Sequence, residues 1–536
     1  MENKRIINLS AMSRKELEEE YIKANDKAAA LEAELEWMRQ QVRLSKSKTF
    51  GASSEKGMLE DGVQQSLFNE AELHSDTEAA EPTAEELTKQ KRQAKKKGEK
   101  KAKVKALPVV VAEYELSEEE QICPACGEPL HEMKKIIREE IEVIPAKYQI
   151  RRHVRHVYAC RNCEKQDTQA TILQPRVPEP MFRNSLASPS LVADIIHRKY
   201  VLSLPLYRQE QEFARYGLSI SRQTISNWIT SAADRYLYRI YEAMKERLRE
   251  ADILHADETE VQVLREPGRA AASKSYMWVY ASGKYEDPCY VYEYAPGRGA
   301  VYPKKFLNGF SGYLQTDGYS VYQNVADDPE RSEDEKIINV CCFAHARRKF
   351  TDALKASSVK DPPNICKGIE FCDALFKVER DSSETDPKER IIYRKEHAGP
   401  ILDEYFAWLK ELEQKVLPRS KLAEAVKYSL NQEIPLRRYM EDGRLEISNN
   451  RAERAVKPFV IGRKNWLFSN TPDGAESSAM IYSIVETAKA CDLKPFEYLT
   501  HILKVLSQTP ETDIEQLLPW SKQLPDTCRM EKEARS

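Results

Sequence analysis

Residues 254–259 have the sequence LHADET, and residues 313–319 have the sequence YLQTDGY. Each places an aspartate, Asp257 or Asp317, at the end of a short apolar run that predicts a β-strand. A third stretch, ISNNRAERAVKPFVIGRKNWLF at residues 447–468, puts Glu453 on a predicted helix rich in arginine and lysine. Three such carboxylates suit a pair of divalent metal ions, which activate a water or hydroxyl and stabilise the leaving oxygen of a phosphodiester. These stretches favour cleavage and joining of nucleic-acid strands.

The residues around the two aspartates predict a run of strands and helices, whose order resembles that of a known fold with a mixed sheet. A first short strand is expected at 253–256, and SYMWVYAS and PCYVYEYA alternate with period two, which predicts antiparallel second and third strands. GAVYPKKFLNGF predicts a short helix, SGYLQT a fourth strand that ends on Asp317, IINVCCF a fifth strand, and HARRKFTDAL a basic helix. This order of elements resembles the ribonuclease-H-like fold. The resemblance implies that strands one and four are central neighbours, so that their acids meet at one metal site.

Neighbouring acids compete with the two aspartates for a functional role. Period-two alternation puts Glu258 on the opposite face of its strand from Asp257. Asp317 has no nearby competitor, and Gly318 after it favours a turn and the close approach of a ligand.

The third acid also has rivals, Glu446 and Glu476. Glu453 is preferred because its neighbouring arginines would counter the phosphates that a metal-bound carboxylate faces. Asn449 and Asn450 are expected to cap the helix that carries it.

Length and charge describe a protein of several parts. At 536 residues the chain predicts three or four folding units. Its net charge of -3 hides an acidic segment at 60–86 and a basic segment, KQKRQAKKKGEKKAKVK, at 89–105, and this asymmetry points to an anionic partner for part of the chain. The sequence has no apolar run long enough for a membrane span and no signal-peptide core at its start. A cytoplasmic protein with no membrane partner is expected, with its 11 cysteines reduced or metal-bound.

The N-terminal region predicts an assembly element followed by a tether. Apolar residues with a seven-residue repeat from Leu17 to Val42 predict a coiled-coil oligomerisation leader at 10–48, which pairs with another copy of the chain. A single amphipathic helix packed on its own protein is the alternative. Residues 52–106 are expected to form a charged flexible linker, whose lysines either contact DNA phosphates or are simply solvated.

Two CxxC pairs, Cys123 with Cys126 and Cys160 with Cys163, are separated by alternating β-branched runs. Two such pairs joined by a hairpin place four thiolates around Zn²⁺, so residues 107–175 predict a zinc ribbon. A site closed by four sulfurs would be structural. Arginines and histidines nearby indicate that the ribbon also touches nucleic acid.

Residues 185–245 are predicted to be helical and to contain a helix-turn-helix. Gly217 and Leu218 form the turn in the sequence PLYRQEQEFARYGLSISRQTISNWIT, and Ser219 or Ser221 caps the second helix. Ile225, Trp228 and Ile229 would face inward. The outward side chains able to reach base edges are Arg222, Gln223, Ser226 and Asn227. An ordinary helical hairpin is the alternative.

The motifs HADETEV, TDGYSVY, CCFAHARRKF, SNNRAERAVKPFVIGRKNWLF and the closing LLPW resemble those of bacterial transposases of the insertion sequence 66 family. The leader LEAELEWMRQQVRLSKSKTFGASSEK, the knuckle CPACG and PLYRQEQEFARYG are similar to the same family, so the resemblance covers nearly the whole chain. It implies a DDE transposase of the bacterial nucleoid with a coiled-coil leader, a zinc module, a helix-turn-helix and a ribonuclease-H-like catalytic domain. Its acids would be Asp257, Asp317 and Glu453.

The resemblance divides the second half of the chain as follows. The catalytic domain is expected at 250–350 and 445–490, a helical insertion at 351–440, and a C-terminal tail at 491–536.

In the implied mechanism Asp257 and Asp317 share two Mg²⁺ or Mn²⁺ ions, and Glu453 completes one of them. The site frees a 3′-hydroxyl at a transposon end and then directs it to a target phosphodiester. Trp466 or Phe468 is expected in the core, with stacking on an end base as the alternative, and His345 either contacts a phosphate or water or makes a structural hydrogen bond. Side chains expected to contact DNA, beyond the helix-turn-helix, are Arg347, Arg348, Lys349, Arg454, Arg463 and Lys464.

Two other classes of function stay open. One is a nuclease of the same fold that cuts without joining, and the other is a catalytically inactive DNA-binding relative. The expected partners are the terminal inverted repeats, target DNA, further copies of the chain and small accessory proteins.

Overall fold

The computed structural model describes single positions between 14 and 39, and residues 147–159, 172–329, 331–332, 335–357 and 362–531. Within 14–39 the described positions are helical, and Tyr21, Leu31, Leu35 and Met38 of the predicted seam are exposed. The linker at 52–106 and the four CxxC cysteines lie outside the described residues. The chain divides into two units, one formed by Asp76–Pro178 with Glu531–Ser536 and the other by the remainder. In the first, β1 (Tyr158–Ala159) pairs with β2 (Ile172–Leu173) in antiparallel orientation.

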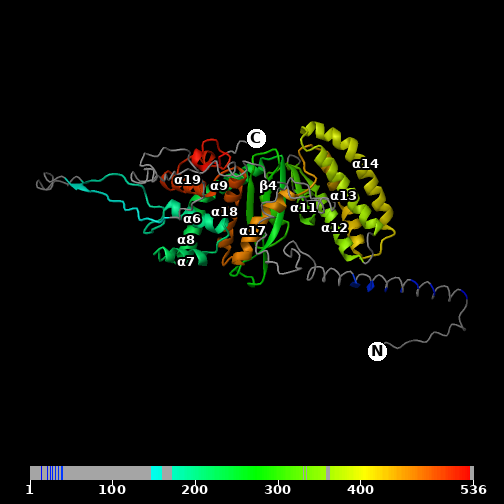
Figure 1. Ribbon diagram of the computed structural model, residues 1–536, viewed down its shortest axis with the longest axis horizontal. Coiled ribbons are helices and arrows are strands. Elements are labelled where there is room, and N and C mark those ends of the chain that lie inside the picture. Colours follow the sequence, from blue (N-terminus) through cyan, green and yellow to red (C-terminus); the bar gives the residue numbers. More distant parts are fainter. Residues whose placement is uncertain are drawn as a thin grey trace, which may run out of the picture. The chain divides into compact units, whose positions relative to one another are not determined.

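The larger unit is built on a five-stranded mixed sheet (Figure 1). Its strands are β3 (Ile253–Gln262), β4 (Lys274–Ser282), β5 (Tyr290–Ala295), β6 (Gly312–Thr316) and β7 (Ile337–Cys341), and their spatial order is β5-β4-β3-β6-β7. β3, β4 and β5 are antiparallel neighbours, whereas β6 is parallel to β3 and β7 is parallel to β6. The two strands associated with Asp257 and Asp317 are therefore adjacent.

The expected first strand at 253–256 was too short. β3 continues to Gln262 because β4 pairs with it along its whole length, so Asp257 lies inside the strand and not at its end. Hydrogen bonding to a long partner strand outweighs the low strand preference of the acidic residues. β6 does end at Thr316, and Asp317 follows it directly as expected.

Helices cover both faces of the sheet. On one face Tyr280 stacks on Phe306 of α10 (Val301–Phe306) with ring centroids 3.6 Å apart, and Trp278 meets Tyr322 of α11 (Ser320–Ala326) edge-on at 5.9 Å. On the other face lie α17 (Asn450–Trp466) and α18 (Pro472–Ala490), where the Tyr292 hydroxyl donates to the carbonyl of Ala455 (Figure 1). The sheet is thus buried between two helical layers.

A helical layer precedes the sheet in sequence. It contains α6 (Pro189–Tyr200), α7 (Leu206–Arg215), α8 (Arg222–Ala232), the π-helical turn η2 (Ala233–Leu237) and α9 (Tyr238–Arg249). Residues 491–536 were expected to be a tail, but they contain α19 (Pro495–Gln508), whose apolar side packs on α6. Two short 3₁₀ turns, η5 (Ile514–Gln516) and η6 (Asp526–Cys528), follow it.

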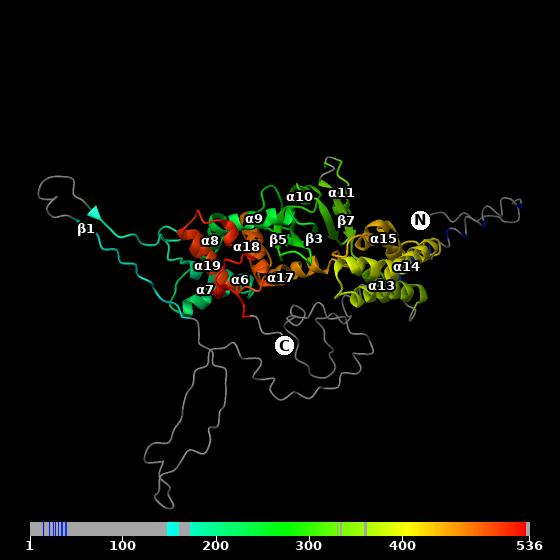
Figure 2. The ribbon, with the colours of Figure 1, turned by 90° about the horizontal axis from the view of Figure 1, so that it is seen from above.

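A second helical group follows β7, in agreement with the mostly helical character predicted for 351–440. It consists of α12 (Phe343–Ala356), α13 (Pro363–Asp381), α14 (Pro387–Glu413), α15 (Lys421–Asn431), α16 (Glu433–Arg437) and η4 (Arg438–Met440). In Figure 2 α13, α14 and α15 lie together beyond the β7 edge of the sheet. Their shared core includes Phe350, Phe371, Tyr405 and Leu409.

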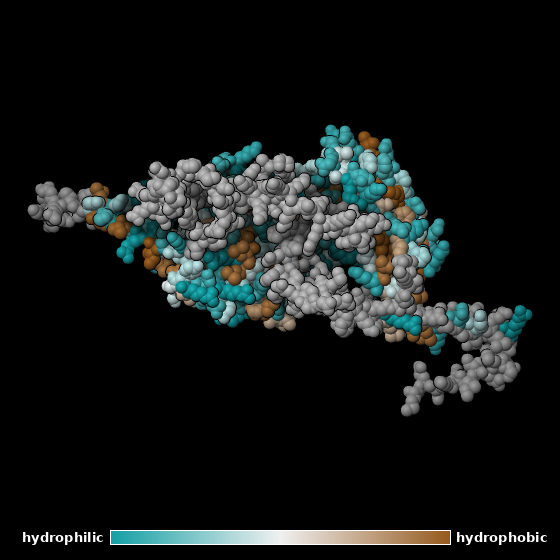
Figure 3. All heavy atoms as spheres, viewed as in Figure 1, coloured by the Kyte–Doolittle hydropathy of each residue, from teal (hydrophilic) through white to brown (hydrophobic). Residues whose placement is uncertain are grey.

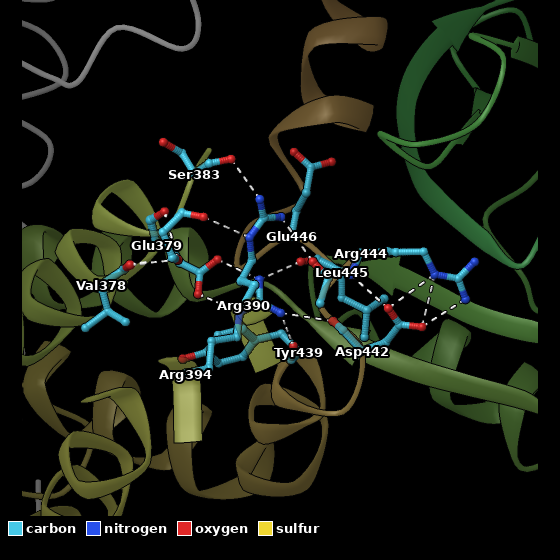
Figure 4. A network of polar contacts seen from close by, with 12 residues as sticks. Val378, Glu379, Ser383, Arg390, Arg394, Tyr439, Asp442, Arg444, Leu445 and Glu446 are labelled. Carbon is cyan, nitrogen blue, oxygen red and sulfur yellow. Dashed lines mark hydrogen bonds and ion pairs between the residues drawn. The ribbon is translucent and has the colours of Figure 1, made fainter. Parts of the chain in front are cut away.

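Arg394 of α14 joins this helical group to the segment that leads into α17 (Figure 4). Its fully buried guanidinium makes two hydrogen bonds to Glu379, of 2.8 and 2.6 Å. It also donates to the carbonyls of Tyr439, Asp442 and Leu445 at 2.6, 2.9 and 2.8 Å. Because all these partners lie in or beside the 439–445 turn or on α13, one side chain fixes the approach of the chain to α17.

Arg394→Ala should lower the free energy of unfolding by about 3–5 kcal/mol, because Glu379 and the three carbonyls would stay buried without their donor. Arg394→Lys should recover only part of this loss, since an ammonium lacks the planar fork. Thermal and urea unfolding would measure both. The exposed Arg380 on α13 is the matched control, and Arg380→Ala should change stability by less than about 0.5 kcal/mol. Equal effects at positions 394 and 380 would contradict this account of the network.

Candidate active site

Asp257 and Glu258 lie on opposite faces of β3, as the period-two alternation predicted. Asp257 shares the α17 face with His255, and its carboxylate accepts the backbone N–H of Glu258 at 2.8 Å. Glu258 accepts from the Tyr322 hydroxyl at 2.6 Å and from Arg298 Nε at 2.7 Å on the α11 face. Glu258 is therefore held by its own partners, and Asp257 is the acid that faces α17.

Asp317 occupies a tight turn after β6. Its Oδ1 accepts the N–H of Tyr319 at 2.8 Å, and Gly318 has a φ of +86°, a backbone conformation that favours glycine. The predicted turn is confirmed, and the close approach of a ligand stays a prediction, but a side chain of the protein itself comes close to Gly318. The group that approaches is the Tyr428 hydroxyl of α15, which lies 2.9 Å from where a Gly318 Cβ would sit and donates to the Asp317 carbonyl at 2.7 Å.

Glu453 lies in the first turn of α17, half-buried beside two cationic or basic side chains of α12. Arg348 Nη2 donates to its carboxylate at 3.1 Å, and His345 Nδ1 lies 3.5 Å from Oε1. Glu446 is engaged elsewhere, with Arg451 Nε at 3.0 Å and His255 Nε2 at 3.3 Å. Although burial acts to raise the pKa of Glu446, His255 and Arg451 hold it well below its usual range.

The third candidate, Glu476, lies on α18, where Asp473 and Asp234 are the acids near enough to raise its pKa. The charges with the largest effect on the pKa of Asp257 are Glu258, Asp317 and Glu453.

Two of the proposed acids, Asp317 and Glu453, act on the third, Asp257. The pKa of Asp257 is raised to about 8 by burial and by Glu258, and also by Asp317 and Glu453. The N–H of Glu258 opposes the shift but does not cancel it. Carboxylates of the β6 turn and of α17 thus lie near enough to Asp257 on β3 for their negative charge to act on it, and a bound cation would offset this charge. Such a donor set fits a divalent cation with oxygen ligands.

Asn449 occupies the N-cap position of α17, as expected, but its side chain makes no capping hydrogen bond. Its Nδ2 donates to the carbonyl of Ala256 at 2.8 Å, and its Oδ1 lies 3.0 Å from His255 Nδ1. The Asn449 amide bonds to β3 and not to its own helix, because β3 offers buried polar groups that need partners. This contact sets the start of α17, and hence Glu453, against the strand of Asp257.

The predicted helix-turn-helix region has the expected local geometry. Ser221, rather than Ser219, caps α8 by accepting the N–H of Thr224, and Gly217 has a φ of +78° in the preceding turn. Ile225 and Ile229 are buried, while Trp228 and Ser226 are only half-buried. Arg222, Gln223 and Asn227 are exposed on the outer side, with Gln223 Nε2 donating to Asn227 Oδ1 at 3.0 Å.

The other predicted DNA contacts are spread over two helices. On α12 Arg347 pairs with Asp373 at 2.6 Å and Arg348 pairs with Glu453. On α17 Arg454 and Arg463 are half-buried and Lys464 is exposed.

The two aromatic residues near the end of α17 differ from the expectation of burial. Trp466 is half-buried, with its ring centroid 6.3 Å from that of Tyr200, but Phe468 is exposed because it follows the helix on an outer turn.

Three residues near the acids escaped the sequence analysis. Arg298 lies 3.9 Å above the ring of Tyr319, bonds to Glu258 and is close enough for Asp317 to affect its ionisation. Tyr428 and His255 position the Asp317 turn and the start of α17. Of these three, only His255 could have been found from the sequence, because it lies two residues before Asp257 and therefore on the same face of the strand. Arg298 lies in a loop, and Tyr428 is more than one hundred residues from the turn that it holds.

Comparisons with known proteins identify the class of the chain. The model described as Transposase IS66 family matches residues 184–477, more than half of the chain. Further matches are the zinc-finger binding domain of transposase IS66 at 120–164, the Transposase C of IS166 homeodomain at 37–111 and the IS66 C-terminal element at 483–520. The site thus lies in a transposase-type protein. More particularly, the chain belongs to the IS66 transposase family.

Curated relatives come from Sinorhizobium fredii (strain NBRC 101917 / NGR234). The protein y4qI is 33% identical over 391 residues, which cover 72% of this chain and 70% of y4qI. The protein y4jD is 29% identical over 424 residues, covering 77% of this chain and 81% of y4jD. No solved structure matches the chain.

The matches bear on cofactors and partners. The zinc-finger match spans Cys123, Cys126, Cys160 and Cys163 and supports Zn²⁺ as a cofactor. Membership of a transposase family implies DNA as a partner and a divalent metal for its chemistry. Among the described residues no helix is both long and apolar enough to cross a membrane. On the face seen in Figure 3, the apolar side chains of the coloured residues form small separate patches.

In the absence of divalent cations, raising the pH from about 5 to about 8 should destabilise the chain. The folded pKa of Asp257 is raised, so the folded chain holds this proton more tightly than the unfolded chain, and stability is lost as the pH rises toward about 8. Asp257→Asn removes the charge and should raise the stability at pH 8 by on the order of 3 kcal/mol. Thermal unfolding at both pH values would measure this.

Two controls accompany that measurement. Asp381→Asn changes an exposed aspartate of α13 and should leave the pH profile as in the parent chain. Added Mn²⁺ should stabilise the parent chain at pH 8 far more than Asp257→Asn. A parent chain and an Asp257→Asn variant with the same pH profile would refute the assignment.

Proposed function

We propose that the chain is a DDE transposase that cuts DNA at transposon ends and joins the freed 3′-hydroxyls to target DNA. The observation that carries this proposal is that Asp317 and Glu453, from two other elements, lie near enough to the buried Asp257 to contribute to its raised pKa. The sheet order β5-β4-β3-β6-β7 supports a ribonuclease-H-like core, because its first strand is flanked by an antiparallel and a parallel neighbour. Membership of the IS66 transposase family supports the same activity.

The proposed chemistry assigns a role to each side chain. Asp257 and Asp317 would hold the divalent ions, and Glu453 would complete the site from α17. When bound, two Mg²⁺ or Mn²⁺ ions increase the acidity of the attacking water or hydroxyl and stabilise the leaving oxygen. Arg298 and Arg348 lie beside the acids and would bind the phosphates that flank the scissile bond. No covalent enzyme intermediate is needed, so no nucleophilic serine or tyrosine is assigned.

Recognition and assembly would use the remaining modules. The outer side of α8 presents Arg222, Gln223 and Asn227 to the major groove, and the zinc module would add contacts to the backbone. Joining requires two ends held together, and the helical positions within 14–39, with exposed Leu31, Leu35 and Met38, support pairing between copies of the chain. Accessory proteins remain part of the proposal.

The catalytic proposal predicts the products of a joining assay. Purified chain, a labelled pre-cut transposon-end duplex and supercoiled plasmid should give joined product with Mg²⁺ or Mn²⁺ and none with EDTA. Asp257→Asn, Asp317→Asn and Glu453→Gln should each lower joining by at least about 1,000-fold, because each removes a ligand of the ions that lower the barrier. Glu476→Gln, which changes an exposed acid of α18, should leave joining nearly unchanged.

The same assay separates the alternatives. Cut or nicked DNA without joined product would favour a nuclease, and joining that survives Asp257→Asn would sink the site assignment. Binding of end DNA with no chemistry under any metal would favour an inactive DNA-binding relative.

The α8 surface predicts a change in binding rather than in chemistry. Arg222→Ala combined with Asn227→Ala should weaken binding to the transposon end by about 1–3 kcal/mol, while binding to unrelated duplex changes much less, because base contacts carry the sequence preference. Fluorescence anisotropy with both duplexes would measure this. The control Lys388→Ala removes an exposed lysine of α14 and should leave both affinities in place. Equal losses on both duplexes would indicate that α8 touches only the phosphate backbone.

A further inference from the structure

His345, Glu453 and Cys342 form a compact group of possible metal ligands. Cys342 is the N-cap residue of α12, His345 lies in the first turn of that helix, and Glu453 lies in the first turn of α17. One ligand atom from each, among the sulfur, an imidazole nitrogen and a carboxylate oxygen, lies within 4.8 Å of the other two. A nitrogen, an oxygen and a sulfur from two helices at this spacing form a donor set for a divalent transition ion more readily than for Mg²⁺.

Arg348 occupies the space between two of these ligands. Its Nη1 lies 3.1 Å from His345 Nε2, and its Nη2 lies 3.1 Å from one Glu453 oxygen and 3.4 Å from the other. A guanidinium carries a positive charge and only donates, so His345 Nε2 accepts and Glu453 is neutralised. The guanidinium therefore satisfies the same lone pairs that a divalent cation would bind.

The two partners of Arg348 are less exposed to solvent than Arg348 itself. His345 and Glu453 are held at helix starts, with side chains 17% and 25% exposed, whereas Arg348 is 53% exposed. His345 Nδ1 is buried without a hydrogen-bond partner, so the histidine depends on Arg348 for its well-made polar contact. The Arg348 side chain can therefore rotate into solvent. His345 and Glu453 are fixed in the first turns of α12 and α17 and stay in place.

We propose that His345 and Glu453 bind one divalent cation together, with Cys342 as the adjacent sulfur donor, and that Arg348 holds their place until the cation displaces it. This inference rests on the proposed function, since Glu453 is also one of the three acids. Arg348 is a built-in counter-ion that lowers the cost of an empty site. Once displaced, its guanidinium is free to bind a DNA phosphate beside the metal, so metal loading and phosphate binding are coupled.

The test measures Mn²⁺ binding to the full-length, zinc-loaded chain by electron paramagnetic resonance. Arg348→Gln should raise the affinity for Mn²⁺ by about tenfold, because it removes the competing cation at roughly ion-pair distance. Arg347→Gln is the matched control, since it removes a positive charge from the residue directly before Arg348 on the same helix. Arg347 is paired with Asp373 and not with the proposed ligands. The control substitution should change the affinity by less than about twofold.

A second measurement identifies the histidine directly. Bound Mn²⁺ should show nitrogen coupling from an imidazole, and His345→Gln should abolish the coupling and lower the affinity by at least about tenfold. His397→Gln, which removes an exposed histidine of α14, should keep both the coupling and the affinity.

The outcomes separate this inference from the proposed function. Mn²⁺ bound without nitrogen coupling, coupling that survives His345→Gln, or an affinity that Arg348→Gln leaves equal or lower would each overturn the inference. Joining that depends on Asp257 would still stand in all three cases. Joining that survives Asp257→Asn would count against the proposed function, whatever the nitrogen coupling shows.

Discussion

The side-chain amide of Asn449 is the contact on which the candidate site most depends. Through the carbonyl of Ala256 and the ring of His255 it fastens the start of α17 to the strand that carries Asp257. An amide can do this because it offers a donor and an acceptor at once, and because β3 is buried, so each bond forms away from competing water. Without this link α17 would still pack on the sheet, but the position of Glu453 along the strand would be less well fixed.

The helical group after β7 has a structural role that its sequence does not reveal. Tyr428 of α15 closes the turn behind Asp317, and Arg394 of α14 gathers the carbonyls of the segment that enters α17. Tyr428 thus supports the turn that carries Asp317, and Arg394 supports the segment that leads into the helix of Glu453. The group therefore holds in place two elements whose carboxylates add to the effect of burial on the raised pKa of Asp257.

The sequence predicted the elements better than their bounds or their neighbours. Alternation placed Asp257 and Glu258 on opposite faces, and local capping rules narrowed the cap of α8 to Ser219 or Ser221, because both signals lie within a few residues. The full length of β3 depended on pairing with β4, which a local pattern cannot supply. The hydrogen bonds of Asn449 to β3 and the approach of Tyr428 to Gly318 join residues that are more than one hundred positions apart in the sequence. Long-range polar contacts of this kind leave no periodic trace in the chain.

The C-terminal helices complete layers that begin much earlier in the chain. α18 covers β5, with Thr487 and Ser483 accepting the N–H groups of Tyr290 and Tyr292, and α19 covers α6. A polypeptide that stops before α18, as a frameshifted or decaying gene copy would produce, leaves the apolar sides of β5 and α6 open to water. Such fragments expose the surface that chaperones and proteases act on. Damaged copies of the gene would thus yield short-lived products instead of stable fragments whose α8 competes with intact protein for the same DNA ends.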